Sequence, residues 1–268
     1  MSGGADSLAL LVLARAAGCA VTAVHVDHGL RAGSAREADV VRDAAARFDA
    51  AFRLVQVAVA PGPNLEARAR EARYAALPPG VLTGHTLDDR AETMVLNLLR
   101  GAGPDGMAAR LAHGARRPLL ALRRSETRAL CAALGLDPVD DPSNADPRFV
   151  RNRVRAEVLP LLDDVAGRDV AALLVRQARA FADDADLLDE LAGSLDVTDA
   201  RALASAPPAL ARRAVRAWLR STGEGLPPDA ASVDRVLAVA RGDAVAAEVA
   251  GGRRVARTGG TLRIEPPA

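Results

Sequence analysis

The amino-terminal part of the chain alternates between helical and strand-like patterns of hydrophobic positions. Apolar residues recur every three or four positions, as in amphipathic helices, at 5–17, 34–48, 64–77 and 87–99. Short apolar runs rich in valine predict buried strands at 20–27, 52–59 and 81–85. This alternation predicts an α/β fold with a doubly wound parallel sheet of the Rossmann-like type.

The rest of the chain is mainly helical. One helix is predicted at 125–134, and a nearly continuous helical stretch runs from 151 to 241. Breaks are expected near Gly193 and at two proline-containing segments. Strand-like segments separated by two glycine pairs follow and predict a small terminal β-meander. We therefore predict two domains, covering residues 1–165 and 166–268.

Composition excludes some classes of protein. All 35 basic residues are arginine, so the chain lacks the lysine of a Walker-type phosphate loop. A net charge of +1 does not by itself indicate a nucleic-acid-binding protein, although residues 100–155 hold 11 arginines against 6 acids. Cys19 and Cys131 match no disulfide or metal pattern. We find no membrane span or signal peptide and expect a cytoplasmic protein.

The chain opens with the sequence SGGADS, which predicts a phosphate-binding turn. Its glycines let the backbone approach a phosphate closely, and the helix that follows points free N–H groups at an anion. The serine hydroxyls can donate to phosphate oxygens, and the aspartate can hold Mg²⁺ or cap the helix. The residues predicted to contact the nucleotide are Ser2, Gly3, Gly4, Ala5, Asp6 and Ser7. For this motif alone, an ordinary capped glycine turn is the alternative.

Two further motifs lie at the predicted carboxyl ends of strands, where an α/β sheet binds its ligands. HVDHGLR places Asp27 and His28 at the end of one strand, and we expect both to line the nucleotide pocket. GHTLDDRAET places His85 at the end of another strand, where it is also expected at the nucleotide. The three motifs therefore point to a single ligand site at one edge of the sheet.

Acidic residues follow His85 at the start of the next predicted helix. Asp88 and Glu92 are four residues apart, so they share one helix face, and Asp89 lies beside them. Such carboxylates can bind Mg²⁺ or position a nucleophile. Alternatively, they only stabilise the positive end of the helix dipole.

The form SGGxDS resembles the PP-loop of ATP pyrophosphatases, which have an adenine nucleotide alpha hydrolase-like fold. Together the motifs resemble the tRNA(Ile)-lysidine synthetase family, and the similarity continues through LLRGAG, DDPSNADPRFVRNRVR and VLPLL to cover residues 2–162 without a gap. The helical remainder is similar in kind to that family's first C-terminal domain. A further C-terminal domain of longer members has no counterpart here.

The resemblance implies a ligase that forms a carbon–nitrogen bond. Such enzymes use ATP, with Mg²⁺, to adenylate the carbonyl oxygen at carbon 2 of the wobble cytidine in a tRNA(Ile) with a CAU anticodon. Free L-lysine then displaces AMP, and the codon read changes from AUG to AUA. Three alternatives stay open: another PP-loop tRNA-modifying enzyme, an amide-forming ATP pyrophosphatase, or a nucleotide-binding module without catalysis. The oligomeric state is also open, and a homodimer is one option.

The resemblance also implies roles for individual residues. Asp6 is the expected Mg²⁺ ligand, helped by Asp88 or Asp89. Glu126, with Asp88 or Glu92, is expected to receive the ammonium of lysine. Arg100 is expected at the activated base or the α-phosphate. The residues expected to take part in catalysis are thus Asp6, Asp88, Glu92, Arg100 and Glu126.

The segment RNRVR and the arginine shortly before it form a basic group at a helix start. Within the family resemblance, contact with the tRNA backbone near the anticodon is the better interpretation than a solvated helix face. The expected tRNA-binding residues are Arg148, Arg151, Arg153 and Arg155.

In the family an apolar strand precedes the loop and is central in the sheet. This chain begins immediately after that strand. Burying about five or six apolar residues at about 1.5–3 kcal/mol each contributes roughly 10 kcal/mol, comparable with the stability of a whole domain. We expect that the true start lies upstream, with a GTG valine codon read as Met1. A stop codon directly before Met1 would refute this, and the alternative is a short, inactive chain.

Overall fold

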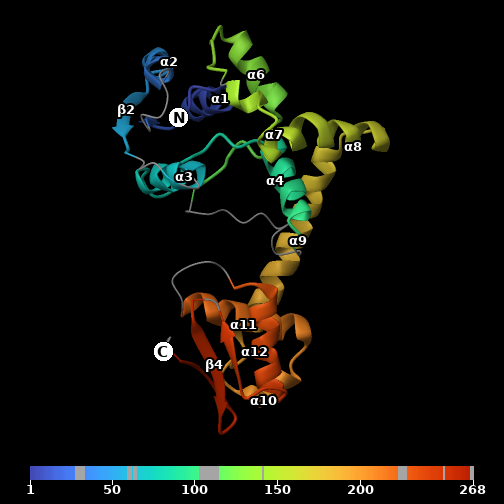
Figure 1. The fold of residues 1–268 in the computed structure, drawn as a ribbon. Coiled ribbons are helices and arrows are strands. Elements are labelled where there is room, and N and C mark those ends of the chain that lie inside the picture. The colour runs from blue at the N-terminus through green and yellow to red at the C-terminus, as the bar shows by residue number, and fades with distance from the viewer. Residues whose placement is uncertain are drawn as a thin grey trace. The chain divides into compact units, whose positions relative to one another are not determined.

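The computed structural model describes residues 1–27, 34–58, 62, 65–102, 115–140, 142–222, 228–249 and 251–265. The chain forms two compact units, Met1–Ala180 and Phe181–Ala268 (Figure 1). They divide within the long helix α9 (Val170–Gly193), later in the chain than the boundary predicted near residue 165. No helix in the described part of the chain is long and apolar enough to cross a bilayer.

The first unit begins with alternating helices and strands, as predicted. These elements are α1 (Ala5–Ala16), β1 (Thr22–Asp27), α2 (Ser34–Arg47) and β2 (Ala51–Gln56). The strands β1 and β2 pair in parallel, with Thr22 opposite Ala51. Leu11 of α1, Ala23 of β1 and Val41 of α2 are buried together. This shared core fixes α1, and with it the turn before α1, against the sheet.

The strand predicted at 81–85 is reduced to one parallel bridge between Leu82 and Arg116. The N–H of Thr83 donates to the carbonyl of Arg116, and the N–H of Arg116 donates to that of Val81. The prediction of a full strand is wrong for the described residues. A strand depends on neighbours along its whole length, and local valine content does not provide them.

Three more helices of the first unit are α3 (Leu65–Ala75), α4 (Leu87–Leu99) and α6 (Arg124–Ala133). Helix α6 packs against α1. Cys131 of α6 is buried, and its thiol lies 3.5 Å from the carbonyl oxygen of Ala5. The start of α1 therefore lies against α6.

The segment after α6 folds as a 3₁₀ turn and a run of short helical pieces. These are η2 (Pro142–Ala145), α7 (Val150–Arg153), the π-helical turn η3 (Val154–Val158) and α8 (Leu159–Ala166). Ala91 and Val95 of α4 are buried with Val154 of η3, Leu159 of α8 and Val175 of α9. This packing presents the basic segment at 151–155 to the acidic start of α4.

The second unit combines helices with a small antiparallel sheet. Its elements after α9 are α10 (Ala200–Ser205), α11 (Pro208–Ser221), α12 (Ala230–Arg241), β3 (Ala246–Val249), β4 (Arg253–Thr258) and β5 (Thr261–Glu265). The three strands pair in the order β3-β4-β5, which confirms the predicted meander. The predicted break near Gly193 is also confirmed, since α9 ends there.

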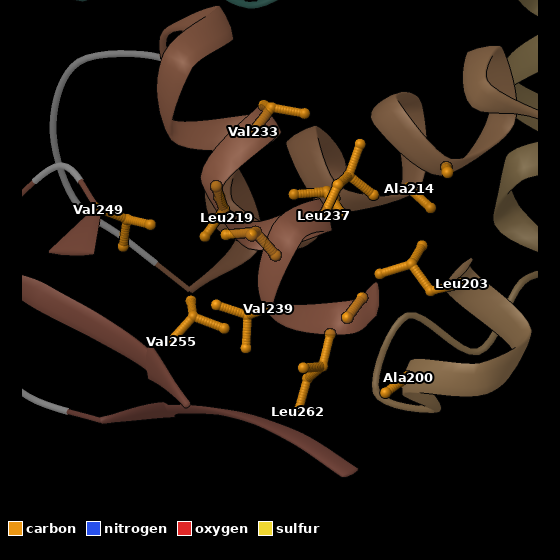
Figure 2. Close-up of a cluster of buried hydrophobic side chains, with 14 of the residues drawn as sticks. Ala200, Leu203, Ala214, Leu219, Val233, Leu237, Val239, Val249, Val255 and Leu262 are labelled. Carbon is orange, nitrogen blue, oxygen red and sulfur yellow. The ribbon is translucent and has the colours of Figure 1, made fainter. Parts of the chain in front are cut away.

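In the described part of the second unit, the core is a cluster of aliphatic side chains (Figure 2). Leu203 of α10, Leu219 of α11 and Leu237 of α12 meet Val255 and Leu262 of the sheet there. The chain contains only four Phe, one Trp and one Tyr, so leucine, valine and alanine supply nearly all of this packing. Truncating one of these leucines should therefore leave a cavity in this core.

We expect Leu262→Ala to lower the free energy of unfolding by about 2–5 kcal/mol, because the side chain is 1% exposed. Trp218 packs against this cluster and is the one tryptophan of the chain, so its fluorescence during a urea titration reports on this unit. The control is Leu187→Ala, at a side chain 57% exposed, which should change stability by no more than about 0.5 kcal/mol. Equal shifts for the two variants would contradict the burial of Leu262.

Candidate active site

The opening turn is shaped by two glycines. Gly3 has a φ of +76°, which residues with a side chain rarely adopt, and a Cβ there would lie 3.1 Å from Val139 Cγ2. Gly4 caps α1, and its carbonyl accepts the N–H groups of Ser7 and Leu8 at 3.0 and 3.1 Å. The Ser7 hydroxyl donates to the same carbonyl at 2.9 Å. The turn thus needs its glycines, and one of its predicted phosphate donors is engaged within the turn.

Two backbone N–H groups at the start of α1 remain available. Within the described part of the chain, no residue accepts a hydrogen bond from the N–H of Ala5 or Asp6. The first N–H groups of a helix have no acceptor inside the helix, and they carry the positive end of its dipole. This is the arrangement that binds a phosphate group.

Gly84 brings the segment that ends in His85 against this helix start. A Cβ on Gly84 would lie 2.6 Å from the carbonyl oxygen of Asp6 and 3.1 Å from the backbone nitrogen of Ser7. Only a residue without a side chain fits here without a shift. Two of the predicted motifs therefore meet at their backbones.

The carboxylate of Asp6 is held by the first turn of α6. The hydroxyl of Thr127 donates to Asp6 Oδ1, and the Arg124 Nε lies 3.6 Å from Asp6 Oδ2. Burial raises the pKa of Asp6 above its ordinary value, although the hydrogen bond from Thr127 and the charge of Arg124 oppose this rise. The site therefore holds a carboxylate that is less well solvated than one at the surface.

Asp89 closes the first turn of α4. Its Oδ2 accepts the N–H of Thr86 at 2.8 Å, and its Oδ1 lies 3.1 Å from both Arg124 Nη2 and Arg151 Nη2. Burial raises the pKa of Asp89, but the Thr86 N–H and the two guanidinium groups outweigh burial and hold that pKa below its usual value. Asp89 thus stays ionised and serves both as a helix cap and as an arginine partner.

Glu92 lies one turn further along α4 and its side chain is fully buried. Three guanidinium groups contact its carboxylate: Arg124 Nη1 at 3.1 Å, Arg151 Nε at 2.8 Å and Arg155 Nε at 2.7 Å. A buried carboxylate is stable only when charges and hydrogen bonds compensate it, as they do here. Glu92 therefore joins α4 to α6 and to the segment at 151–155.

Asp88 faces a cavity of about 170 Å³. Its Oδ2 accepts the N–H of Arg124 at 2.7 Å, and its Oδ1 lies 2.9 Å from Arg123 Nη2. Arg155 and Asp163 also line the cavity. A pocket that carries both acids and guanidinium groups suits a zwitterion with one cationic and one anionic end.

Comparison with known proteins identifies the family. Residues 1–162 match the PP-loop domain family. The tRNA(Ile)-lysidine synthase of Nocardia farcinica is 49% identical over 249 residues, which cover 85% of this chain and 77% of that protein. The chain belongs to the tRNA(Ile)-lysidine synthase family. The predicted family and enzyme class, a ligase that forms carbon–nitrogen bonds, are confirmed with it.

Further matches extend the family assignment along the chain. The tRNA(Ile)-lysidine synthase of Mycobacterium bovis is 44% identical over an alignment that covers 99% of this chain and 90% of that protein. Residues 199–263 match the TilS substrate binding domain, which lies in the second unit. Among solved structures, the U34-tRNA thiolase NcsA from Methanococcus maripaludis, with its [4Fe-4S] cluster, aligns with a TM-score of 0.54 and 16% identity. That alignment covers 68% of this chain and 71% of the thiolase, and it supports the predicted fold class.

The structure brings most of the predicted acidic residues of this family member together. Asp6, Asp88, Asp89 and Glu92 all contact Arg124. His85 is close enough for its charge to act on Asp89. The predicted convergence of the opening turn and the GHTLDDRAET motif is therefore present in the structure.

Other predicted site residues lie elsewhere. Arg100 caps the far end of α4, about 18 Å along the helix axis from Asp88. Glu126 is exposed, and its Oε2 accepts the N–H of Arg123 at 2.6 Å as the cap of α6. Asp27 ends β1, and His28 lies outside the described residues. The roles expected of these four residues stay predictions.

The four arginines predicted to bind tRNA separate into two pairs. Arg151 and Arg155 turn inward to the carboxylates of α4. Arg148 and Arg153 are exposed, and each forms a local ion pair, Arg148 with Asp146 at 2.6 Å and Arg153 with Glu157 at 2.8 Å. The second pair is the more exposed, at 85% and 59% of the side chain against 40% and 32% for Arg151 and Arg155.

Apart from Glu126, the residues at the start of α6 were not among the predicted site residues. Arg123, Arg124 and Thr127 surround Asp6 and Asp88, yet only Glu126 of that helix was singled out. A signal was present, because an acid at the third helical position is commonly a cap. Once Glu126 is assigned as a cap, Arg123 and Arg124 are the charged residues of that turn that remain as site candidates.

The acidic side chains of the site differ in how well each could bind Mg²⁺. No group of three or more His, Cys, Asp or Glu residues that could hold a metal occurs among the described residues. Mg²⁺ commonly binds through one or two carboxylates together with substrate phosphates, so this does not conflict with it. Among the described residues, the basic group beside Asp6 Oδ2 is Arg124 at 3.6 Å, whereas both oxygens of Asp89 already accept close donors. Asp6 therefore fits a magnesium ion better than Asp89.

Proposed function

We propose that this chain joins free L-lysine to carbon 2 of the wobble cytidine in a tRNA(Ile) with a CAU anticodon. The cytosine carbonyl oxygen attacks the α-phosphorus of ATP, and pyrophosphate leaves. The neutral ε-amine of lysine then attacks carbon 2, AMP leaves with that oxygen, and the amine loses a proton. Because the substrate is a tRNA, we place the enzyme in the cytoplasm.

The observation that carries this proposal is the meeting of the opening turn with the acidic start of α4. The free N–H groups of Ala5 and Asp6 supply donors for the phosphates of ATP. Gly84 keeps the two motifs in backbone contact. Donors fixed in this way stabilise charge on a departing phosphate without the lysine of a Walker loop.

Asp6 is the proposed ligand of Mg²⁺, which would neutralise charge on the leaving pyrophosphate. The Asp6 carboxylate follows the phosphate-binding turn directly and has open acceptor capacity on Oδ2. Asp89 then serves mainly to hold Arg124 and Arg151 in place. The predicted metal role of Asp89 is accordingly secondary in this proposal.

The cavity beside Asp88 is the proposed site for lysine. Asp88 and Asp163 can hydrogen-bond the ammonium, and Arg123 or Arg155 can pair with the carboxylate. A carboxylate next to the amine can also accept the proton that the amine loses. Glu126 and Arg100, which were expected to take part, are not among the residues that line this cavity.

The test supplies the chain with ATP, Mg²⁺, labelled lysine and tRNA(Ile) bearing CAU. We expect one AMP, one pyrophosphate and one tRNA-bound lysine per turnover. The matched control is the same tRNA with the wobble cytidine replaced by uridine, which should give none of the three. ATP binding without any AMP release would favour a non-catalytic nucleotide-binding module.

Thiolation of tRNA is not favoured, although the similar solved structure is a thiolase. The chain has two cysteines. Cys19 is exposed beyond the end of α1, whereas Cys131 is buried against the beginning of that helix. They do not form the cysteine pair that sulfur transfer or a cluster needs.

Arg153 is the proposed contact to the tRNA backbone. Because it pairs with Glu157, substitutions of the two residues should change tRNA affinity in opposite directions. Arg153→Gln should weaken tRNA binding a few-fold and reduce the salt dependence by about one phosphate contact. Glu157→Gln should strengthen tRNA binding, because the guanidinium no longer has a competing carboxylate at 2.8 Å. Filter binding at several salt concentrations measures both, with ATP affinity as the control. Equal losses of tRNA and ATP binding in Arg153→Gln would contradict this role.

A further inference from the structure

The first turn of α6 contacts both motifs of the proposed site. The Arg124 guanidinium lies 3.6 Å from Asp6 of the opening motif. It also lies 3.1 Å from both Asp89 and Glu92 on α4. Its own backbone N–H donates to Asp88 at 2.7 Å. One residue thus contacts every acidic side chain that the structure gathers from α1 and α4.

Burial of Arg124 makes it hard for water to take the place of its carboxylate partners. The Arg124 side chain is 18% exposed, so little water is available to replace its carboxylate partners. Its guanidinium is planar with donors in fixed directions, so contact with carboxylates on two helices restricts how those helices are spaced. Lysine at this position could offer a charge but not the same fork of donors.

Thr127 adds a second, independent hold on Asp6. Its side chain is buried, at 1% exposure, and its hydroxyl donates to Asp6 Oδ1. The alternative acceptor for that single proton is the carbonyl of Arg124, at 2.9 Å. An ionised carboxylate is the stronger acceptor, so the hydroxyl is expected to fix the orientation of Asp6.

We propose that Arg124 and Thr127 are positioning residues for the adenylation step, an inference that rests on the proposed function. They keep the Asp6 carboxylate at a fixed place relative to Asp89 and Glu92. The distance between the phosphate-binding turn and the lysine site thereby stays constant as substrates bind and products leave. Neither residue is assigned contact with a reacting atom.

The central experiment compares Thr127→Val with Thr127→Ser. Valine has nearly the shape of threonine but no hydroxyl, whereas serine keeps the hydroxyl and loses a methyl group. We expect Thr127→Val to lower the kcat for tRNA-dependent pyrophosphate release by about 10-fold or more, since small misplacements near reacting groups are costly. The KM values for ATP and lysine should change by less than about threefold, because the binding donors remain. Thr127→Ser should recover most of the lost rate.

Arg124→Lys and Arg124→Gln test the second residue, with Arg128→Gln as the control. Arg128 lies on the same helix, 66% exposed, with its closest described acid 4.0 Å away. Both Arg124 variants should lose kcat, because neither supplies the fork, and Arg128→Gln should match the wild type. Melting temperatures of all variants separate a loss of positioning from a loss of folding.

Two results would overturn the inference. One is a Thr127→Val variant with wild-type kcat. The other is a Thr127→Ser variant as slow as Thr127→Val, since a purely structural role depends on the methyl group as much as on the hydroxyl. Failure of the proposed function is seen separately, in the wild-type protein: no pyrophosphate release with ATP, lysine and tRNA would overturn the function and the positioning role together.

Discussion

Glu92→Gln is expected to lower the free energy of unfolding by about 3–5 kcal/mol, the usual effect of removing one partner from a buried ion pair. Glu92 is fully buried, and its carboxylate is shared by Arg124, Arg151 and Arg155. Glutamine keeps the shape but leaves these three guanidinium groups without their common anion. Urea unfolding followed by circular dichroism measures the change.

The control for Glu92→Gln is Glu157→Gln. Glu157 also pairs with an arginine, at 2.8 Å, but its side chain is 52% exposed, so water can replace the carboxylate. Its loss should therefore change the free energy of unfolding much less than the loss of Glu92 does. Adding Arg155→Gln to Glu92→Gln should recover part of the loss, because it removes one unbalanced charge. Similar stabilities for Glu92→Gln and Glu157→Gln would show that the arginine cluster is solvated.

The local pattern of the chain predicts its helices well. Helix α1 and strand β1 appear where the hydrophobic period places them, and α9 ends at the predicted break at Gly193. Helix periodicity and glycine breaks are properties of a few consecutive residues, so they can be read without knowing the fold. The 81–85 segment differs, because its pairing partner, Arg116, is distant in the chain.

In the site, too, neighbours within one helix could be predicted from the sequence, whereas contacts between distant segments could not. Asp88 and Glu92 were predicted to share a face because both lie on α4. Arg124 could not be placed beside Asp6 from the sequence, since the chain between them includes several helices and strands before α6 packs on α1. Glu126 caps α6, and an acid that caps its own helix looks the same in the sequence as one that binds a ligand.

The predicted arginines illustrate a further limit. Arg151 and Arg155 are four residues apart and share a face, whereas Arg153 lies between them and points elsewhere. The spacing alone separates these two sets. It does not say which set meets an acidic partner inside the protein, since that depends on the packing of η3 against α4.

Asp6→Asn is expected to reduce the rate of pyrophosphate release by at least about 10²–10³, the range found when one preorganised group that stabilises transition-state charge is removed. The substitution keeps the size of the side chain and one acceptor oxygen for Thr127. It removes the negative charge beside the free N–H groups of α1, where we propose that Mg²⁺ binds. Single-turnover assays with ATP and tRNA measure the rate.

The same substitution should leave the protein at least as stable as the wild type. Burial raises the pKa of Asp6, so folding disfavours its charged form relative to the unfolded chain. A neutral side chain of the same shape avoids this cost, although Arg124 loses one of its three carboxylates. Asp6→Asn should therefore lower activity without lowering stability, whereas Glu92→Gln should lower both. An Asp6→Asn variant that keeps its rate, or one that loses rate only because it unfolds, would contradict the assignment of Asp6 to the reaction.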